Sequence, residues 1–150
     1  MSAERLSASE RERLGPVMQL LDWSRVRLYR GTTAGPARAL RRLLLWASRG
    51  RAIALGNHVF LPDRCEGDLG MLAHELTHCA QYQRWGALTY FSRGAMVQLR
   101  DLVHRVFGVG HSPYSYRLKK GKPLGEYGME QQGQIVEDWF RRTDQDAPSA

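Results

Sequence analysis

The sequence of 150 residues has few cysteines and no long apolar segment. Its two cysteines, Cys65 and Cys79, are too few for a disulfide framework, so we expect two free thiols. The longest purely apolar run, Leu43 to Ala47, is far shorter than the roughly 20 residues of a transmembrane helix. The charged segment MSAERLSASERERLG has no apolar core of a secretory signal peptide, so we expect residence in the cytoplasm and no membrane association.

Acidic residues are also absent between Trp23 and Pro62. The arginines of this interval are Arg25, Arg27, Arg30, Arg38, Arg41, Arg42, Arg49 and Arg51. Such a segment suits an acidic protein, an anionic surface or nucleic acid. No glycine-rich RNP-like run and no zinc-finger spacing accompanies it, so a solvated basic face or an acidic partner is expected and nucleic acid is not.

The remaining composition and periodicity predict one α+β domain, mainly helical, over residues 1–142, followed by a flexible tail over 143–150. A capping box, Ser7 to Glu10, predicts a first helix, and Gly56-Asn57 predicts a hairpin turn. Further helices are predicted over residues 37–47, 68–85, 95–107 and 127–142, and strands over residues 26–29, 52–55, 58–61 and 114–118. The strands near the N-terminus predict a small antiparallel sheet or hairpin.

The most informative stretch is GMLAHELTHCAQYQ, which contains His74-Glu75-Leu76-Thr77-His78. On a helix, residues four apart lie on one face, so both imidazoles can bind one metal ion while Glu75 reaches a water at that ion. The opposite face carries apolar residues: Leu69, Leu72, Ala73, Leu76, Cys79 and Ala80. A core face backed by a metal-binding face is what a metallohydrolase requires. The alternatives are an ordinary solvated polar face, or a structural zinc site that recruits Cys65.

A catalytic zinc ion usually has three protein ligands. The longer pattern H-E-x-x-H-x-x-G-x-x-H fails, because Gln81 and Arg84 occupy its last two specified positions. Four residues elsewhere are candidates: His104, His111, Glu130 and Glu137. The two glutamates share a face of the last predicted helix with Tyr127, whereas Met129, Ile135, Val136, Trp139 and Phe140 line the other face. Gly133 would allow another helix to approach closely. The alternative for the glutamates is a solvated face with a Glu137–Arg141 ion pair.

The segments VRLYRG, ALGNHVFLP, LAHELTHCAQYQ and YGMEQQGQIVEDWF resemble the Vgr-related proteins, relatives of a metallopeptidase domain associated with contractile injection systems. The resemblance spans residues 4–142, and HELTHxxQ and YGxEQQxxIV are its most specific parts. It implies a compact zincin-like (minigluzincin-like) fold and a Zn²⁺ cofactor held by His74, His78 and Glu130, with Glu137 as the alternative. It also implies a link to a type VI or other contractile secretion system, with export by that route.

The leading hypothesis is therefore zinc-dependent hydrolysis of peptide bonds, with Glu75 as the general base. Tyr127 is the first candidate for stabilising the oxyanion, ahead of Tyr114, Tyr116 and His111. The predicted strand 58–61 would offer an edge to an extended peptide. The alternative is a non-catalytic, zinc-stabilised binding or adaptor module for a secretion-system component or a toxin.

Overall fold

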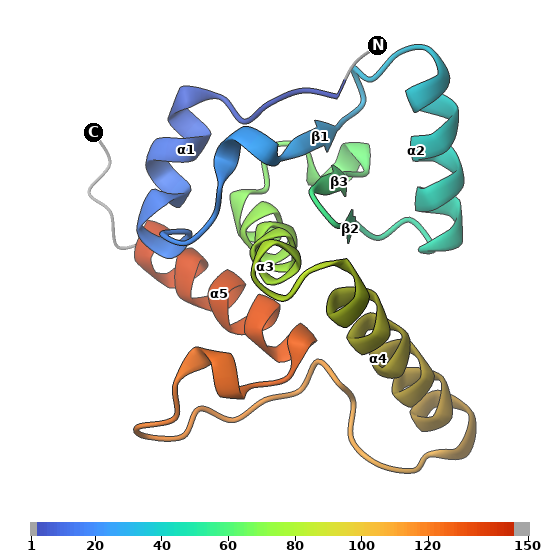
Figure 1. Ribbon diagram of the computed structural model, residues 1–150, viewed down its shortest axis with the longest axis vertical. Helices are drawn as coiled ribbons and strands as arrows, with labels where there is room; N and C mark the ends of the chain where they lie inside the picture. The colour runs from blue at the N-terminus through green and yellow to red at the C-terminus, as the bar shows by residue number, and fades with distance from the viewer. Residues whose placement is uncertain (1–2, 146–150) are drawn as a thin grey trace.

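The computed structural model describes residues 3–145 and has an α+β architecture in which α3 lies at the centre (Figure 1). The elements are α1 (Ala8–Leu14), β1 (Arg27–Tyr29), α2 (Pro36–Ala47), β2 (Ile53–Leu55), β3 (His58–Phe60), α3 (Leu69–Trp85), α4 (Ala87–Phe107) and α5 (Met129–Gln145). None of the helices in the described part of the chain is long and apolar enough to cross a membrane. Residues 143–145 of the expected tail are helical, and residues 146–150 lie outside the described part.

The small sheet has the strand order β1-β3-β2. Strands β2 and β3 form the predicted antiparallel hairpin, and Gly56 adopts a φ of 64° in its turn. Strand β1 pairs parallel to β3, so the sheet is mixed and not antiparallel throughout. The reason is that α2 lies between β1 and the hairpin and carries the chain across, as parallel pairing requires. Strand β3 is consequently central, with β1 and β2 at the two edges, so the prediction of a peptide-binding edge at residues 58–61 is wrong.

Helix α3 begins and ends where the sequence predicts. The Asp68 side chain accepts a hydrogen bond from the Met71 amide at the N-cap, and Gly86 ends the helix with a φ of 77°. The apolar face forms the core, with Leu76 and Cys79 fully buried. The opposite face is also buried, because α5 covers it (Figure 1).

Helix α5 packs closely on α3 at Gly133. A Cβ atom at this position would lie 2.8 Å from Nε2 of His74, so the glycine is what admits the imidazole ring. Val136 and Phe140 are buried as predicted, but Trp139 is 46% exposed, so its assignment to the core face is wrong. The apolar face that α5 buries in the core is therefore narrower than the sequence predicts.

Helix α4 begins at Ala87, earlier than the predicted Ala95. Its first turns are anchored to the edge strand β2, because the buried Tyr90 hydroxyl donates a hydrogen bond to the Ala54 carbonyl. The predicted strand over residues 114–118 is a loop. No strand of residues 3–145 pairs with it, and the Ser115 carbonyl instead accepts a hydrogen bond from the Gln131 side chain on α5.

The arginine-rich interval is partly structural. Arg41 is buried on α2 and donates hydrogen bonds to the Tyr29 and Leu61 carbonyls, which fastens α2 to the sheet. Arg30 forms an ion pair with Glu10. The basic character of this interval therefore serves packing as well as the surface, since a guanidinium group can satisfy several backbone carbonyls at once.

Candidate metal centre

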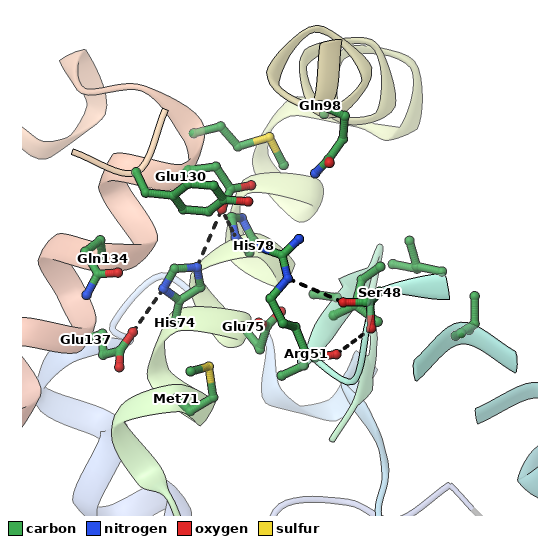
Figure 2. Close-up of a pocket in the computed structure, with 18 of the residues that line it drawn as sticks. Ser48, Arg51, Met71, His74, Glu75, His78, Gln98, Glu130, Gln134 and Glu137 are labelled. Carbon is green, nitrogen blue, oxygen red and sulfur yellow. Dashed lines mark hydrogen bonds and ion pairs between the residues drawn. The ribbon is translucent and has the colours of Figure 1, made fainter. Parts of the chain in front are cut away.

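Helices α3 and α5 bring two imidazoles and one carboxylate together. Nε2 of His74 lies 3.7 Å, and Nε2 of His78 3.5 Å, from the same Oε2 atom of Glu130. Three ligand atoms, one from each residue, lie within 4.8 Å of one another. Figure 2 shows both histidines directed toward Glu130. His74, His78 and Glu130 therefore form one cluster.

These separations fit a tetrahedral zinc ion. Nitrogen and oxygen ligands lie about 2.0–2.2 Å from zinc, which places the ligand atoms of a tetrahedron roughly 3.3–3.6 Å apart. The two distances to Glu130 agree with this range within about 0.2 Å. Two neutral imidazoles and one carboxylate are also a donor set that zinc accepts while keeping one position open.

The other ring nitrogen of each histidine is already occupied. Nδ1 of His74 donates to Oε2 of Glu137 over 3.2 Å, and Nδ1 of His78 donates to Oε1 of Gln81 over 2.9 Å. Hydrogen bonds of this kind fix the ring orientation and the tautomer, so each Nε2 lone pair is left for a metal ion. Glu137, the alternative third ligand, is thus placed behind His74, and Glu130 is the carboxylate that faces both Nε2 atoms.

An outer layer of hydrogen bonds supports these residues. The Gln81 amide donates to the Met129 carbonyl and to Oε1 of Gln132, which turns its own oxygen toward His78. Arg141 links Glu137 to Asp68, the residue that caps α3. Helical periodicity and the H-E-x-x-H spacing did not predict these roles of Gln81 and Gln132. Both residues nevertheless belong to the motif segments HELTHxxQ and YGxEQQxxIV, which was the available signal.

The protonation equilibria reflect this close arrangement. Burial lowers the pKa of His74, but the neighbouring carboxylates of Glu130 and Glu137 outweigh it and raise the pKa to about 10. His78 is also buried, and Glu130 likewise raises its pKa. Burial would raise the pKa of Glu130, yet the two histidines hold it well below its usual value. In the metal-free protein, protons on the histidines balance the carboxylates, and a bound cation would replace those protons.

Glu75 faces the same space from α3. Its side chain is buried, and burial raises its pKa against the opposing effect of His78 and His74. A carboxylate with a raised pKa is a stronger base than an exposed one. Glu75 also lines a cavity of about 620 Å³ together with His74, His78 and Glu130. Segments of α2, β2 and α4 form the other walls of this cavity.

Of the tyrosine candidates, the structure brings Tyr114 to the cavity. Burial and the nearby Glu130 raise the pKa of Tyr114, so its hydroxyl remains a donor. Tyr127, the first candidate from the sequence, does not line the cavity, and its hydroxyl accepts a hydrogen bond from the Lys119 amide. Tyr116 donates to Asp138 on α5. The one tyrosine candidate that lines the cavity thus comes from the loop between α4 and α5.

The other candidate ligands lie apart from the cluster. His104 and His111 do not line the cavity. Cys65 is free and lines the cavity, but it is not part of the cluster of ligand atoms formed by His74, His78 and Glu130. Cys79 is free and fully buried in the core. Within the described residues, the geometry therefore favours a site with three protein ligands over one closed by a thiolate.

Three comparisons with known proteins relate the chain to injection systems. The type VI secretion system spike protein VgrG2b of Pseudomonas aeruginosa is 31% identical over 105 residues, which is 63% of this chain and 10% of that protein. This chain therefore spans about a tenth of the length of that relative. The structure of the effector domain of Pseudomonas aeruginosa VgrG2b superposes with a TM-score of 0.68 at 27% identity, covering 95% of this chain and 76% of that one.

The family match covers the first part of the chain, from α1 to the end of α3. The model of the eCIS core domain matches residues 5–86, more than half of the sequence, and includes His74, Glu75 and His78. Glu130 lies outside the matched residues, on α5. The chain belongs to the eCIS core domain family.

Proposed function

We propose that this domain is a zinc-dependent peptidase. The observation that carries the proposal is the convergence of Nε2 of His74, Nε2 of His78 and Oε2 of Glu130, with the buried Glu75 in the same cavity. The relation to a spike-protein effector domain supports a contractile injection system as the setting, with a component of that system or a toxin as partner.

The residues divide the work of hydrolysis among them. When bound, a zinc ion would polarise the scissile carbonyl and activate a water molecule. A carboxylate oxygen of Glu75 would accept the proton of that water and deliver it to the leaving amine. The raised pKa of Glu75 suits this exchange, because a base with a pKa nearer to neutral both takes up and returns a proton. Tyr114, which lines the cavity, would donate a hydrogen bond to the oxyanion.

The substitution Glu75→Gln tests this proposal. The amide retains the shape of the side chain but cannot act as a base, and Glu75 is not one of the three clustered ligand residues. We expect zinc content by elemental analysis to equal that of the wild type, while cleavage of a mass-spectrometric peptide library falls by at least about 100-fold. Glu130→Gln is the matched variant, and it should lose zinc as well as cleavage.

Two outcomes would contradict the proposal. Cleavage that persists in the Glu75→Gln variant would show that another group is the base. A wild-type protein that carries zinc and cleaves no member of the library would favour the alternative, a non-catalytic zinc-stabilised binding module for a secretion-system component.

A further inference from the structure

One wall of the cavity carries two arginines that have no acidic partner in residues 3–145. Arg51 precedes β2, and Arg64 lies in the short turn Asp63–Cys65 before α3. Both side chains line the cavity, and neither takes part in an ion pair of the described residues. Nη1 of Arg64 lies 3.5 Å from the position of a Cβ atom at Gly50, so the Arg64 guanidinium group lies beside the segment that carries Arg51.

Arg51 extends toward the metal-binding residues. In Figure 2 its side chain points toward His78 and Glu130. Nε donates to the Ser48 carbonyl over 3.4 Å, which holds the base of the guanidinium group at the end of α2. The Arg51 guanidinium group also lies near Tyr114. Burial raises the pKa of Tyr114, and the positive charge of Arg51 acts in the opposite direction. A substrate lying over the metal-binding residues would therefore meet Arg51.

The balance of charge in the cavity favours an anionic ligand. Its lining carboxylates are Glu75, Glu130 and Glu137. Glu137 is paired with Arg141, which lies behind the wall. The two charges of a bound zinc ion would balance the other two glutamates, so Arg51 and Arg64 would remain uncompensated. A cavity with two unpaired guanidinium groups attracts anions, and guanidinium binds carboxylate through paired hydrogen bonds.

We propose that Arg51 and Arg64 form a subsite for a carboxylate of the peptide substrate. The inference rests on the proposed peptidase function and adds the substrate class, namely peptides with an acidic group beside the scissile bond. That group is either an aspartate or glutamate side chain or the C-terminal carboxylate of the peptide. The lining of the cavity also includes the apolar side chains of Ile53, Leu55 and Phe91, so the subsite recognises acidic groups next to apolar residues.

The test is binding of matched peptides to the zinc-loaded Glu75→Gln protein, which holds peptides without cleaving them. The probes are fluorescein-labelled alanine–leucine decapeptides with one glutamate at each position in turn, and the same set with glutamine. Each peptide is made with a free and with an amidated C-terminus. At one position of the glutamate, we expect the glutamate peptide to bind about tenfold more tightly than its glutamine counterpart. This factor is the lower end of the range for a hydrogen bond to a charged group, because both arginines are exposed. If amidation of the C-terminus instead weakens binding about tenfold, the terminal carboxylate is the group that the subsite binds.

Variants separate this subsite from general electrostatic attraction. Combining Arg51→Gln with Arg64→Gln should reduce the preference to less than about twofold, whereas Arg42→Gln, an exposed arginine of α2 outside the cavity, should retain it. Equal binding of glutamate, glutamine, free and amidated peptides, no binding of any peptide, or a preference that survives the double substitution would overturn the subsite. A wild-type protein that cleaves no peptide while the preference persists would instead refute hydrolysis and leave the subsite standing.

Discussion

Replacing Gly133 by alanine is expected to weaken zinc binding although alanine favours a helix. The new Cβ would lie 2.8 Å from Nε2 of His74 and 3.0 Å from two ring carbons, closer than the about 3.5–4.0 Å of an ordinary carbon contact. Removing a helical glycine contributes about 1 kcal/mol, and overpacking a buried ring costs about 1–3 kcal/mol. The free energy of unfolding should therefore fall by about 0–2 kcal/mol. Because Nε2 is displaced, zinc affinity should fall about 10–100-fold.

Gly94 provides the matched control. It lies inside α4 and lines the cavity, but nothing lies within 4 Å of its Cβ position. Gly94→Ala should raise the unfolding midpoint by about 2–4 °C and leave zinc affinity unchanged. Competition with a chromophoric chelator measures the affinity, and thermal unfolding in excess EDTA measures the stability. If Gly133→Ala retains wild-type affinity and gains the same stability as Gly94→Ala, the reasoning about close packing is refuted.

Three further predictions concern the supporting residues. Glu137→Gln should keep a metal site but lower its zinc affinity about 10–100-fold, because His74 loses the carboxylate that orients its ring. Chelator competition should show a smaller loss than for Glu130→Gln, and equal losses would contradict the assigned positions. In chelator-treated protein, His74 has a folded pKa of about 10 against 6.5 when unfolded, so its stabilisation is complete below pH 6.5 and is lost as the pH rises toward 10. Urea unfolding at pH 6 and pH 9 should therefore show lower stability at pH 9, and a flat or rising profile would argue against the buried ion pairs. Tyr90→Phe should cost about 1–3 kcal/mol in urea unfolding with unchanged zinc content, because the buried Ala54 carbonyl loses its donor; a neutral effect would show that the anchor of α4 is dispensable.

Local patterns in the sequence predicted those helix ends and turns that depend on interactions between residues close together in the chain. Asp68 and Gly86 define the ends of α3, and the four-residue spacing places His74 and His78 on one face whatever surrounds the helix. The Gly56-Asn57 turn similarly predicted the hairpin. The same local rules failed for the strand expected at residues 114–118, because alternation without a neighbouring strand cannot form a ladder.

The choice between Glu130 and Glu137 illustrates what the helix wheel left open. Both glutamates share one face of α5, and they lie two turns apart. Which of them meets the Nε2 atoms depends on where α5 crosses α3 and how it is rotated. Close packing at Gly133 places Glu130 at Nε2 of His74 and Glu137 at Nδ1 of the same ring.

The sequence by itself determined that this protein has a helix with two histidines on one face and a glutamate beside the first, because helical periodicity alone orients His74, Glu75 and His78. Only the tertiary structure decided which glutamate meets the two histidines, the support from Gln81 and the approach of Tyr114 and Arg51 to the cavity. Those relations join residues far apart in the chain. Their distances follow from how helices and loops pack, which no pattern within one segment specifies.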